Sequence, residues 1–99
     1  FINKDKLKYF KNDAILINTS RGEIINDKDL ISFLKVNKNA IYCTDVLTNE
    51  TRGVKQNPIV KYAKRNNNIL ITPHIGGMTH QAQYLAYNHA AKLLNKYLK

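Results

Sequence analysis

Ninety-nine residues, 43% of them hydrophobic, are enough for one small domain with a modest core. A formal net charge of +9 could indicate a nucleic-acid partner, but the lysines are spread over polar positions of helical segments, so we expect solvated helix faces and no nucleic-acid partner. No apolar run approaches the roughly 20 residues that span a bilayer, which predicts no membrane partner.

The amino end is rich in lysine and has no apolar run typical of a secretory leader. The single cysteine, Cys43, has no partner within the chain for a disulfide and lies in an apolar run where a small buried side chain is common. These features favour a reducing, cytoplasmic location.

The first predicted element is a short amphipathic helix that begins after Asn3 and ends near Asn12. Asn3 is a favourable N-cap residue, and Leu7 and Phe10 follow at helical spacing. The continuous apolar run Ala14–Asn18 then predicts a strand buried on both faces, as in a parallel sheet.

A second helix is predicted to begin after Asn26 or Asp27, either of which could cap it. Carboxylates in its first turn suit the helix dipole. Its apolar side chains recur on one face, namely Leu30, Ile31 and Leu34. The next apolar run, Ala40–Thr44, predicts a second buried strand, so the chain closes a strand-helix-strand unit.

A polar loop follows, and Pro58–Lys64 is expected to form one or two helical turns. Asn66–Asn68 indicates a turn, and Ile69–Thr72 is a third run typical of a buried strand. Thr79 can cap a long amphipathic helix that continues to the end of the chain. This alternation of strands and helices predicts an α/β fold with right-handed crossovers.

Polar clusters follow each of the three predicted strands, at Thr19–Gly22, Asp45–Glu50 and His74–Gly77. Binding sites in open α/β sheets lie beyond the carboxyl ends of the strands, so we expect these clusters to meet at one edge. The chain has neither a GxGxxG nor a GxxxxGK[ST] motif, so it lacks the usual loop that binds a pyrophosphate.

These clusters contain side chains suited to acid substrates and proton transfer. Arg21 could bind a carboxylate through two parallel hydrogen bonds, although a surface arginine in a turn has the same local sequence. His74 and Glu50 could form an imidazole–carboxylate pair that exchanges a proton with a hydroxyl or carbonyl, the alternative being an ordinary loop histidine. His80 and His89 are interpreted as ordinary helix residues, and no metal site is expected.

Three runs in order, ILINTSRGEIINDKDLISFL, TDVLTNE and ILITPHIGGMT, resemble the carboxy-terminal half of the NAD-binding domain of the D-isomer-specific 2-hydroxyacid dehydrogenases, the phosphoglycerate dehydrogenase-like family. The resemblance spans nearly the whole chain. It implies half of a Rossmann-type doubly wound parallel sheet, with about three strands and flanking helices, over residues 1–78. It also implies a carboxy-terminal helix, residues 79–99, that extends away and returns toward a substrate domain.

The resemblance also implies roles for individual residues. Arg21 would bind the substrate carboxylate and polarise its carbonyl, His74 would be the acid/base, and Glu50 would hydrogen-bond to His74. The residues lining the nicotinamide end of NAD would be Thr19, Ser20, Arg21, Asp45, His74, Ile75, Gly76 and Gly77. The family usually has proline where this chain has Thr51, and the loop from Thr51 to Asn57 is unlike the common form.

The implied enzyme interconverts 2-hydroxy and 2-keto acids with NAD as cofactor and forms a homodimer when complete. The phosphate-binding loop would precede Phe1, so we expect the 99 residues alone to be inactive, to bind NADH feebly and to associate through an unpaired sheet edge. Two alternatives remain at this point: a non-enzymatic basic binding module, and a corepressor-like member of the family. The identity of the acid is not predicted.

Overall fold

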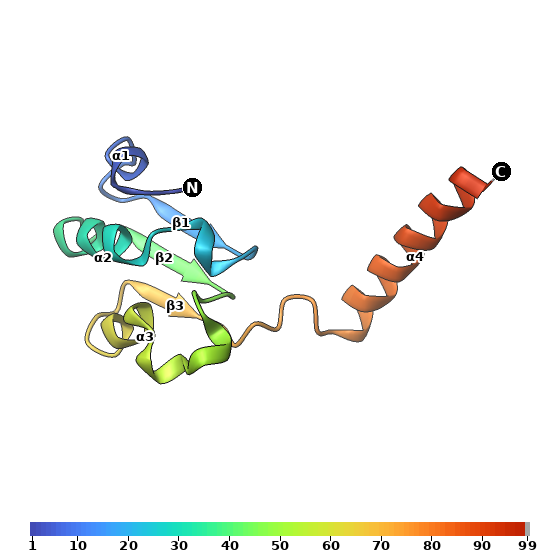
Figure 1. Ribbon diagram of the computed structural model, residues 1–99. Coiled ribbons are helices and arrows are strands. Elements are labelled where there is room, and N and C mark those ends of the chain that lie inside the picture. Colours follow the sequence, from blue (N-terminus) through green and yellow to red (C-terminus); the bar gives the residue numbers. More distant parts are fainter. Residues whose placement is uncertain (99) are drawn as a thin grey trace.

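The computed structural model describes residues 1–98 as a three-stranded parallel sheet, helices beside it, and one helix that projects from it (Figure 1). The strands lie in the order β1-β2-β3, with Ile15 opposite Ile41 and Tyr42 opposite Ile69. The elements are α1 (Lys4–Leu7), β1 (Ile15–Asn18), α2 (Asp27–Val36), β2 (Ile41–Thr44), α3 (Pro58–Ala63), β3 (Ile69–Ile71) and α4 (His80–Leu98). The predicted α/β half-sheet is confirmed, with each strand end within one residue of its expected position.

Side-chain caps fix where the later helices begin. The Asn26 side chain accepts a hydrogen bond from the backbone N–H of Asp29 at 3.0 Å, so Asn26 is the cap of α2. Asn57 caps α3 in the same way. Thr79 Oγ1 accepts from the N–H of Ala82 at 3.0 Å, which confirms the predicted cap of α4.

The first helix is shorter than predicted, because α1 ends at Leu7 after a single turn. Asn3 occupies the N-cap position, but its side chain makes no capping hydrogen bond. Phe10 lies beyond the helix and packs edge-on against Phe33 of α2, with ring centroids 6.2 Å apart. Tertiary packing, not helical spacing, therefore places Phe10.

The hydrophobic core lies between the sheet and the helices α1, α2 and α3. Tyr42, at the centre of β2, is buried there. The core cluster also includes side chains from each of these helices and from the loops between the elements: Leu7, Ile25, Leu30, Leu34, Ala40, Leu47, Ile59 and Tyr62. Burial of this cluster is the main stabilising contribution visible in the fold.

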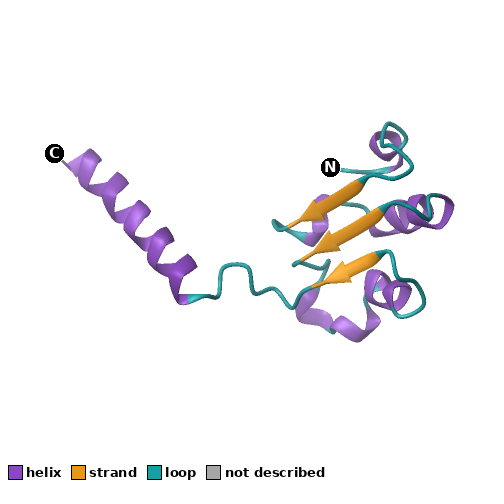
Figure 2. Ribbon diagram, turned by 180° about the vertical axis from the view of Figure 1, so that it is seen from behind, coloured by secondary structure: helices purple, strands orange, loops and turns teal. Residues whose placement is uncertain are grey.

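The opposite face of the sheet is bare, as Figure 2 shows with the strands in front of the helices. Its side chains are exposed at Ile15 (65%), Ile17 (65%), Ile41 (40%) and Leu70 (60%). The expectation that the strands are buried on both faces is therefore wrong for residues 1–98. The reason is topological: two successive crossovers of the same hand place α2 and α3 on the same side.

We expect the purified chain to associate through this bare face, because contiguous exposed apolar side chains promote association. Replacing Ile17 and Leu70 by threonine should shift sedimentation toward the monomer. Val36→Thr is the control, since Val36 is also apolar and even more exposed but lies on α2. A wild-type chain that sediments as a monomer at all accessible concentrations would contradict this expectation.

The last helix, α4, stands apart from the sheet at the end of an extended connection (Figure 1). None of its described residues is buried. This confirms the prediction of a carboxy-terminal helix that extends away. Within residues 1–98, no helix has both the length and the apolar character needed to cross a membrane.

Candidate active site

The loop after β1 is held from within by Asn18, the buried last residue of that strand. Asn18 Oδ1 accepts a hydrogen bond from the N–H of Ser20 at 3.1 Å, and its Nδ2 donates to the carbonyl of Arg21 at 3.0 Å. The backbone of Ser20 and Arg21 is thereby fixed beyond the strand end. Sequence reasoning did not single out Asn18, although a polar amide at the end of an apolar run was a usable signal.

Gly22 lets the loop after β1 (Thr19–Gly22, the β1 loop) pack directly against the loop after β2 (Asp45–Glu50, the β2 loop). A Cβ atom at Gly22 would lie 2.2 Å from the carbonyl carbon of Leu47 and 2.2 Å from the backbone nitrogen of Thr48. Both neighbours are backbone atoms, so no side-chain movement could relieve the clash. The close approach of these two loops therefore requires glycine.

Two carboxylates from the segment after β1 accept hydrogen bonds from the β2 loop. Glu23 Oε1 accepts from the N–H of Asn49 at 3.2 Å, and Asp27 Oδ1 accepts from the hydroxyl of Thr48 at 3.3 Å. Burial raises the pKa of the Asp27 carboxyl. The sequence predicts Asp27 only as a cap or first-turn residue of a helix, and its contact with Thr48 depends on the tertiary fold.

Asp45 joins the β2 loop to the β3 loop. Its Oδ1 accepts hydrogen bonds from the Thr72 hydroxyl at 2.5 Å and from the N–H of Ile75 at 3.0 Å. Its Oδ2 accepts from the N–H of Gly76 at 2.8 Å. The hydrogen bond from Thr72, and then those from Gly76 and Ile75, lower the pKa of the Asp45 carboxyl. Asp45 therefore sets the path of the loop that carries His74.

This lowered pKa gives a pH-dependent prediction for the loop. A carboxylate with a depressed pKa stabilises the fold above its unfolded-state pKa, and that contribution is lost as the pH falls through the folded-state value. The amide signals of Ile75 and Gly76 should therefore titrate together, with a midpoint below the ordinary range of aspartate. Thr72→Val should move the midpoint upward, whereas an ordinary midpoint in the wild type would contradict the geometry.

The Glu50 and His74 side chains are in direct contact, with Glu50 Oε2 2.6 Å from His74 Nδ1. Glu50 Oε1 also accepts from the N–H of Leu47 at 2.7 Å. The hydrogen bond with His74, followed by that from Leu47, lowers the pKa of the Glu50 carboxyl. An ionised carboxylate can only accept, so Nδ1 carries the proton in this pair and Nε2 is the ring atom left for exchange.

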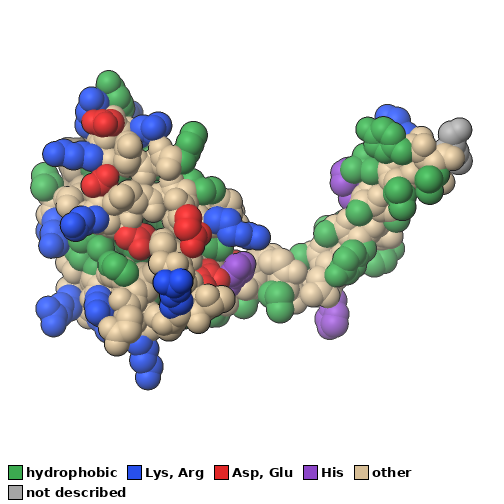
Figure 3. Space-filling view, viewed as in Figure 1, with side chains coloured by type: hydrophobic (Ala, Val, Ile, Leu, Met, Phe, Trp, Pro, Cys, Tyr) green, Lys and Arg blue, Asp and Glu red, His purple; other side chains and the backbone are tan. Residues whose placement is uncertain are grey.

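His74 has a left-handed backbone conformation, with φ of 55°. This conformation is uncommon for residues other than glycine, and histidine is among the residues that adopt it more often. Its backbone N–H donates to the carbonyl of Thr72 at 3.0 Å, which tightens the turn. In Figure 3 a histidine side chain lies beside acidic ones at this edge of the sheet, in agreement with the contact between His74 and Glu50.

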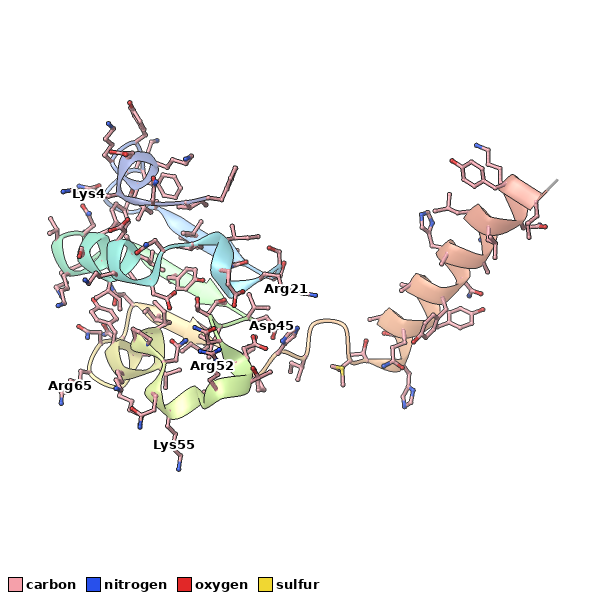
Figure 4. The ribbon with its side chains drawn as sticks, in the orientation of Figure 1. Lys4, Arg21, Asp45, Arg52, Lys55 and Arg65 are labelled. Carbon is pink, nitrogen blue, oxygen red and sulfur yellow. The ribbon has the colours of Figure 1, made fainter. Side chains whose placement is uncertain are left out.

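Arg21 lies at the same edge but does not contact the histidine pair. Its Nη1 donates to the carbonyl of Ser20 at 2.7 Å, and its side chain extends past the strand ends on the side where Asp45 lies (Figure 4). Its charge contributes to lowering the pKa of Glu50. The structure therefore pairs Glu50 with His74 and leaves the Arg21 guanidinium largely free.

A cavity of about 280 Å³ opens beside His74. Carboxylates, a hydroxyl and apolar side chains line it together: Asp45, Leu47, Glu50, Val54, Ile71, Thr72, Pro73 and His74. This volume is near the lower end of small-molecule sites in proteins. Thr19 and Gly77, the remaining expected site residues, border the same edge without a hydrogen bond to Asp45 or His74.

The chain matches a known protein family over the sheet that carries this site. Residues 1–76 match the D-isomer specific 2-hydroxyacid dehydrogenase, NAD binding domain. The chain belongs to this family. The match covers the sheet and the site loops as far as Gly76, which confirms the resemblance drawn from the motifs.

Individual dehydrogenases are also similar to this chain in sequence. The chain is 39% identical over 97 residues to erythronate-4-phosphate dehydrogenase of Legionella pneumophila strain Lens, covering 98% of the chain and 25% of the relative. It is 32% identical over 98 residues to D-3-phosphoglycerate dehydrogenase of Methanocaldococcus jannaschii, covering 99% of the chain and 18% of the relative. The chain thus spans about a quarter or less of these proteins.

A solved structure of a family member has the same fold. The crystal structure of D-lactate dehydrogenase with NAD⁺ from Lactobacillus jensenii matches with a TM-score of 0.66 and 31% identity. The match covers 79% of this chain and 26% of that one. The matched domain in this family binds NAD. In this chain a small cavity lies beside His74, and a Cβ atom at Gly76 would lie 3.0 Å from Asp45 Oδ2, so glycine permits the close approach of this loop to Asp45.

Proposed function

We propose that this chain supplies the catalytic edge of an NAD-dependent dehydrogenase that interconverts 2-hydroxy and 2-keto acids. The observation that carries the proposal is the 2.6 Å contact between Glu50 and His74 beside a small cavity at the carboxyl edge of the sheet. Family membership supports the reaction class. We further propose that residues 1–78 are half of the nucleotide-binding domain and that residues 79–99 lead toward a substrate domain.

In this proposal His74 moves the proton. Glu50 holds Nδ1, so Nε2 donates a proton to the keto oxygen during reduction and takes it back during oxidation. Glu50 keeps the ring in one orientation through this contact. The left-handed turn held by Asp45 fixes the position of the ring.

Arg21 binds the acid in this proposal. A guanidinium can hold a carboxylate by two parallel hydrogen bonds and places positive charge near the oxygen that becomes negative. The fixed backbone of Ser20 and Arg21 limits where the guanidinium can reach. NAD supplies or accepts the hydride when it is bound.

The proposal is tested on the chain itself by NMR titration with NADH and with oxamate, a 2-keto acid analogue. Both ligands should bind weakly, without turnover, and shift the amides of Ser20–Gly22, Asp45 and His74–Gly77 most. Arg21→Gln should abolish the oxamate shifts, and Lys61→Gln, a matched exposed cation on α3, should leave them unchanged. Shifts centred elsewhere, or oxamate shifts that survive Arg21→Gln, would overturn the proposal.

A further inference from the structure

A groove of about 720 Å³ runs between α2 and α3, on the side of the helices away from the sheet. Apolar side chains of Ile31, Pro58 and Tyr62 line it, together with Asn66. Its remaining lining residues are all cations: Lys35, Lys38, Lys61, Lys64 and Arg65. Figure 3 shows Lys and Arg side chains around apolar ones on this side of the molecule, and Figure 4 labels Arg65 at the end of α3.

The positive charge of the groove is not neutralised within residues 1–98. No carboxylate lines the groove, and the single ion pair of the described chain joins His74 to Glu50 at the other edge. The sequence predicts lysines spread over solvated helix faces, but the fold gathers four lysines and Arg65 around one apolar floor. Such a charged rim attracts an oppositely charged partner and orients it.

The groove continues into a second cavity of about 590 Å³ with a different charge. The two cavities share Ile31, Lys35 and Pro58. The second is also lined by the carboxylates of Glu23 and Asp27, which anchor the β2 loop. The combined groove is therefore strongly basic at one end and mixed in charge at the other.

We propose that this groove binds an acidic amphipathic segment of a partner protein, with apolar side chains on the floor and carboxylates against the cationic rim. Helix-in-groove recognition has this form: an apolar face fills the groove and polar residues flank it. The occupant would place its acidic end beside Arg65 and a neutral or basic end beside Glu23 and Asp27.

A nucleic acid fits this groove less well than a protein segment. Tyr62 is only 8% exposed, so its ring cannot serve as a platform for base stacking. A uniformly anionic backbone would also meet Glu23 and Asp27 in the second cavity. The aliphatic floor of Ile31 and Pro58 stabilises an apolar side chain and offers little to a phosphate backbone.

The test uses the full 99-residue chain and a labelled helical peptide of alternating leucine and glutamate pairs. Binding should weaken about tenfold or more when glutamine replaces the glutamates, or when the chain carries Lys35→Gln, Lys61→Gln and Arg65→Gln together. The matched control carries Lys6→Gln, Lys8→Gln and Lys11→Gln, which remove the same charge near α1. Circular dichroism of both triple variants checks that they fold.

Equal weakening in the two triple variants would show a response to net charge alone and overturn the proposal. Absence of peptide binding to the wild type would do the same. Single-stranded oligo-dT is the competing probe: tighter binding of oligo-dT than of the peptide, abolished by the groove variant and falling steeply with salt, would assign the groove to nucleic acid instead.

Discussion

His74→Asn is expected to lower kcat by about a thousandfold in a hybrid enzyme where residues 1–76 of this chain replace the matching part of the Lactobacillus jensenii D-lactate dehydrogenase. Removal of the imidazole removes the proton donor, so no side chain protonates the keto oxygen as the hydride is transferred from NADH. Asparagine is the substitute because it tolerates the left-handed φ of 55° at this position. Pyruvate reduction, followed by NADH absorbance, measures the effect.

Two further variants of the hybrid make this prediction specific. Glu50→Gln keeps a hydrogen-bonding group near Nδ1 but removes its charge, so it should cost less than His74→Asn. Lys61→Gln removes an exposed charge on α3 and should leave kcat unchanged. A His74→Asn hybrid with a kcat within a few fold of its parent would exclude His74 as the acid/base.

Gly22→Ala is expected to destabilise the chain by about 3 kcal/mol, a large fraction of the roughly 5–15 kcal/mol typical of a small domain. The added Cβ would lie 2.2 Å from backbone atoms of Leu47 and Thr48, so the β1 and β2 loops must separate. That separation would also disturb Glu50, whose Oε1 accepts from the N–H of Leu47. Urea unfolding followed by circular dichroism measures the loss.

Gly77→Ala is the matched control for this experiment. A Cβ atom at Gly77 would have no neighbour within 4 Å, and its φ is not positive, so the free energy of unfolding should change by no more than about 0.5 kcal/mol. Similar unfolding midpoints for Gly22→Ala and the wild type would contradict the close packing of the two loops.

The sheet and most helix starts were predictable from sequence because they depend on local features. Continuous apolar runs identified the strands, and side chains such as Asn26 and Thr79 marked helix starts through short-range hydrogen bonds. The bare face was not predictable, because Ile17 and Leu16 are equally apolar and the pattern does not tell which face the helices cover. The helix α1 is also shorter than the sequence predicts, because Phe10 packs against Phe33 beyond the end of the helix.

The candidate site also has a part that the sequence predicts and a part that depends on the tertiary fold. The motifs that resemble the family placed Glu50 and His74 on loops that meet, and the structure brings their side chains together. The supporting contacts depend on long-range geometry that no local pattern encodes. Asp45 reaches across to Gly76, and Gly22 fits against Leu47, only because parallel strands bring these loops to one edge.

Pyruvate reduction by the unmutated hybrid tests the central claim most directly. NADH-dependent turnover is expected, because residues 1–76 supply Arg21, Glu50 and His74 while the Lactobacillus jensenii part supplies the remainder of the enzyme. A hybrid that folds, binds NADH and yet fails to reduce pyruvate would contradict the assignment of this edge as a dehydrogenase active site.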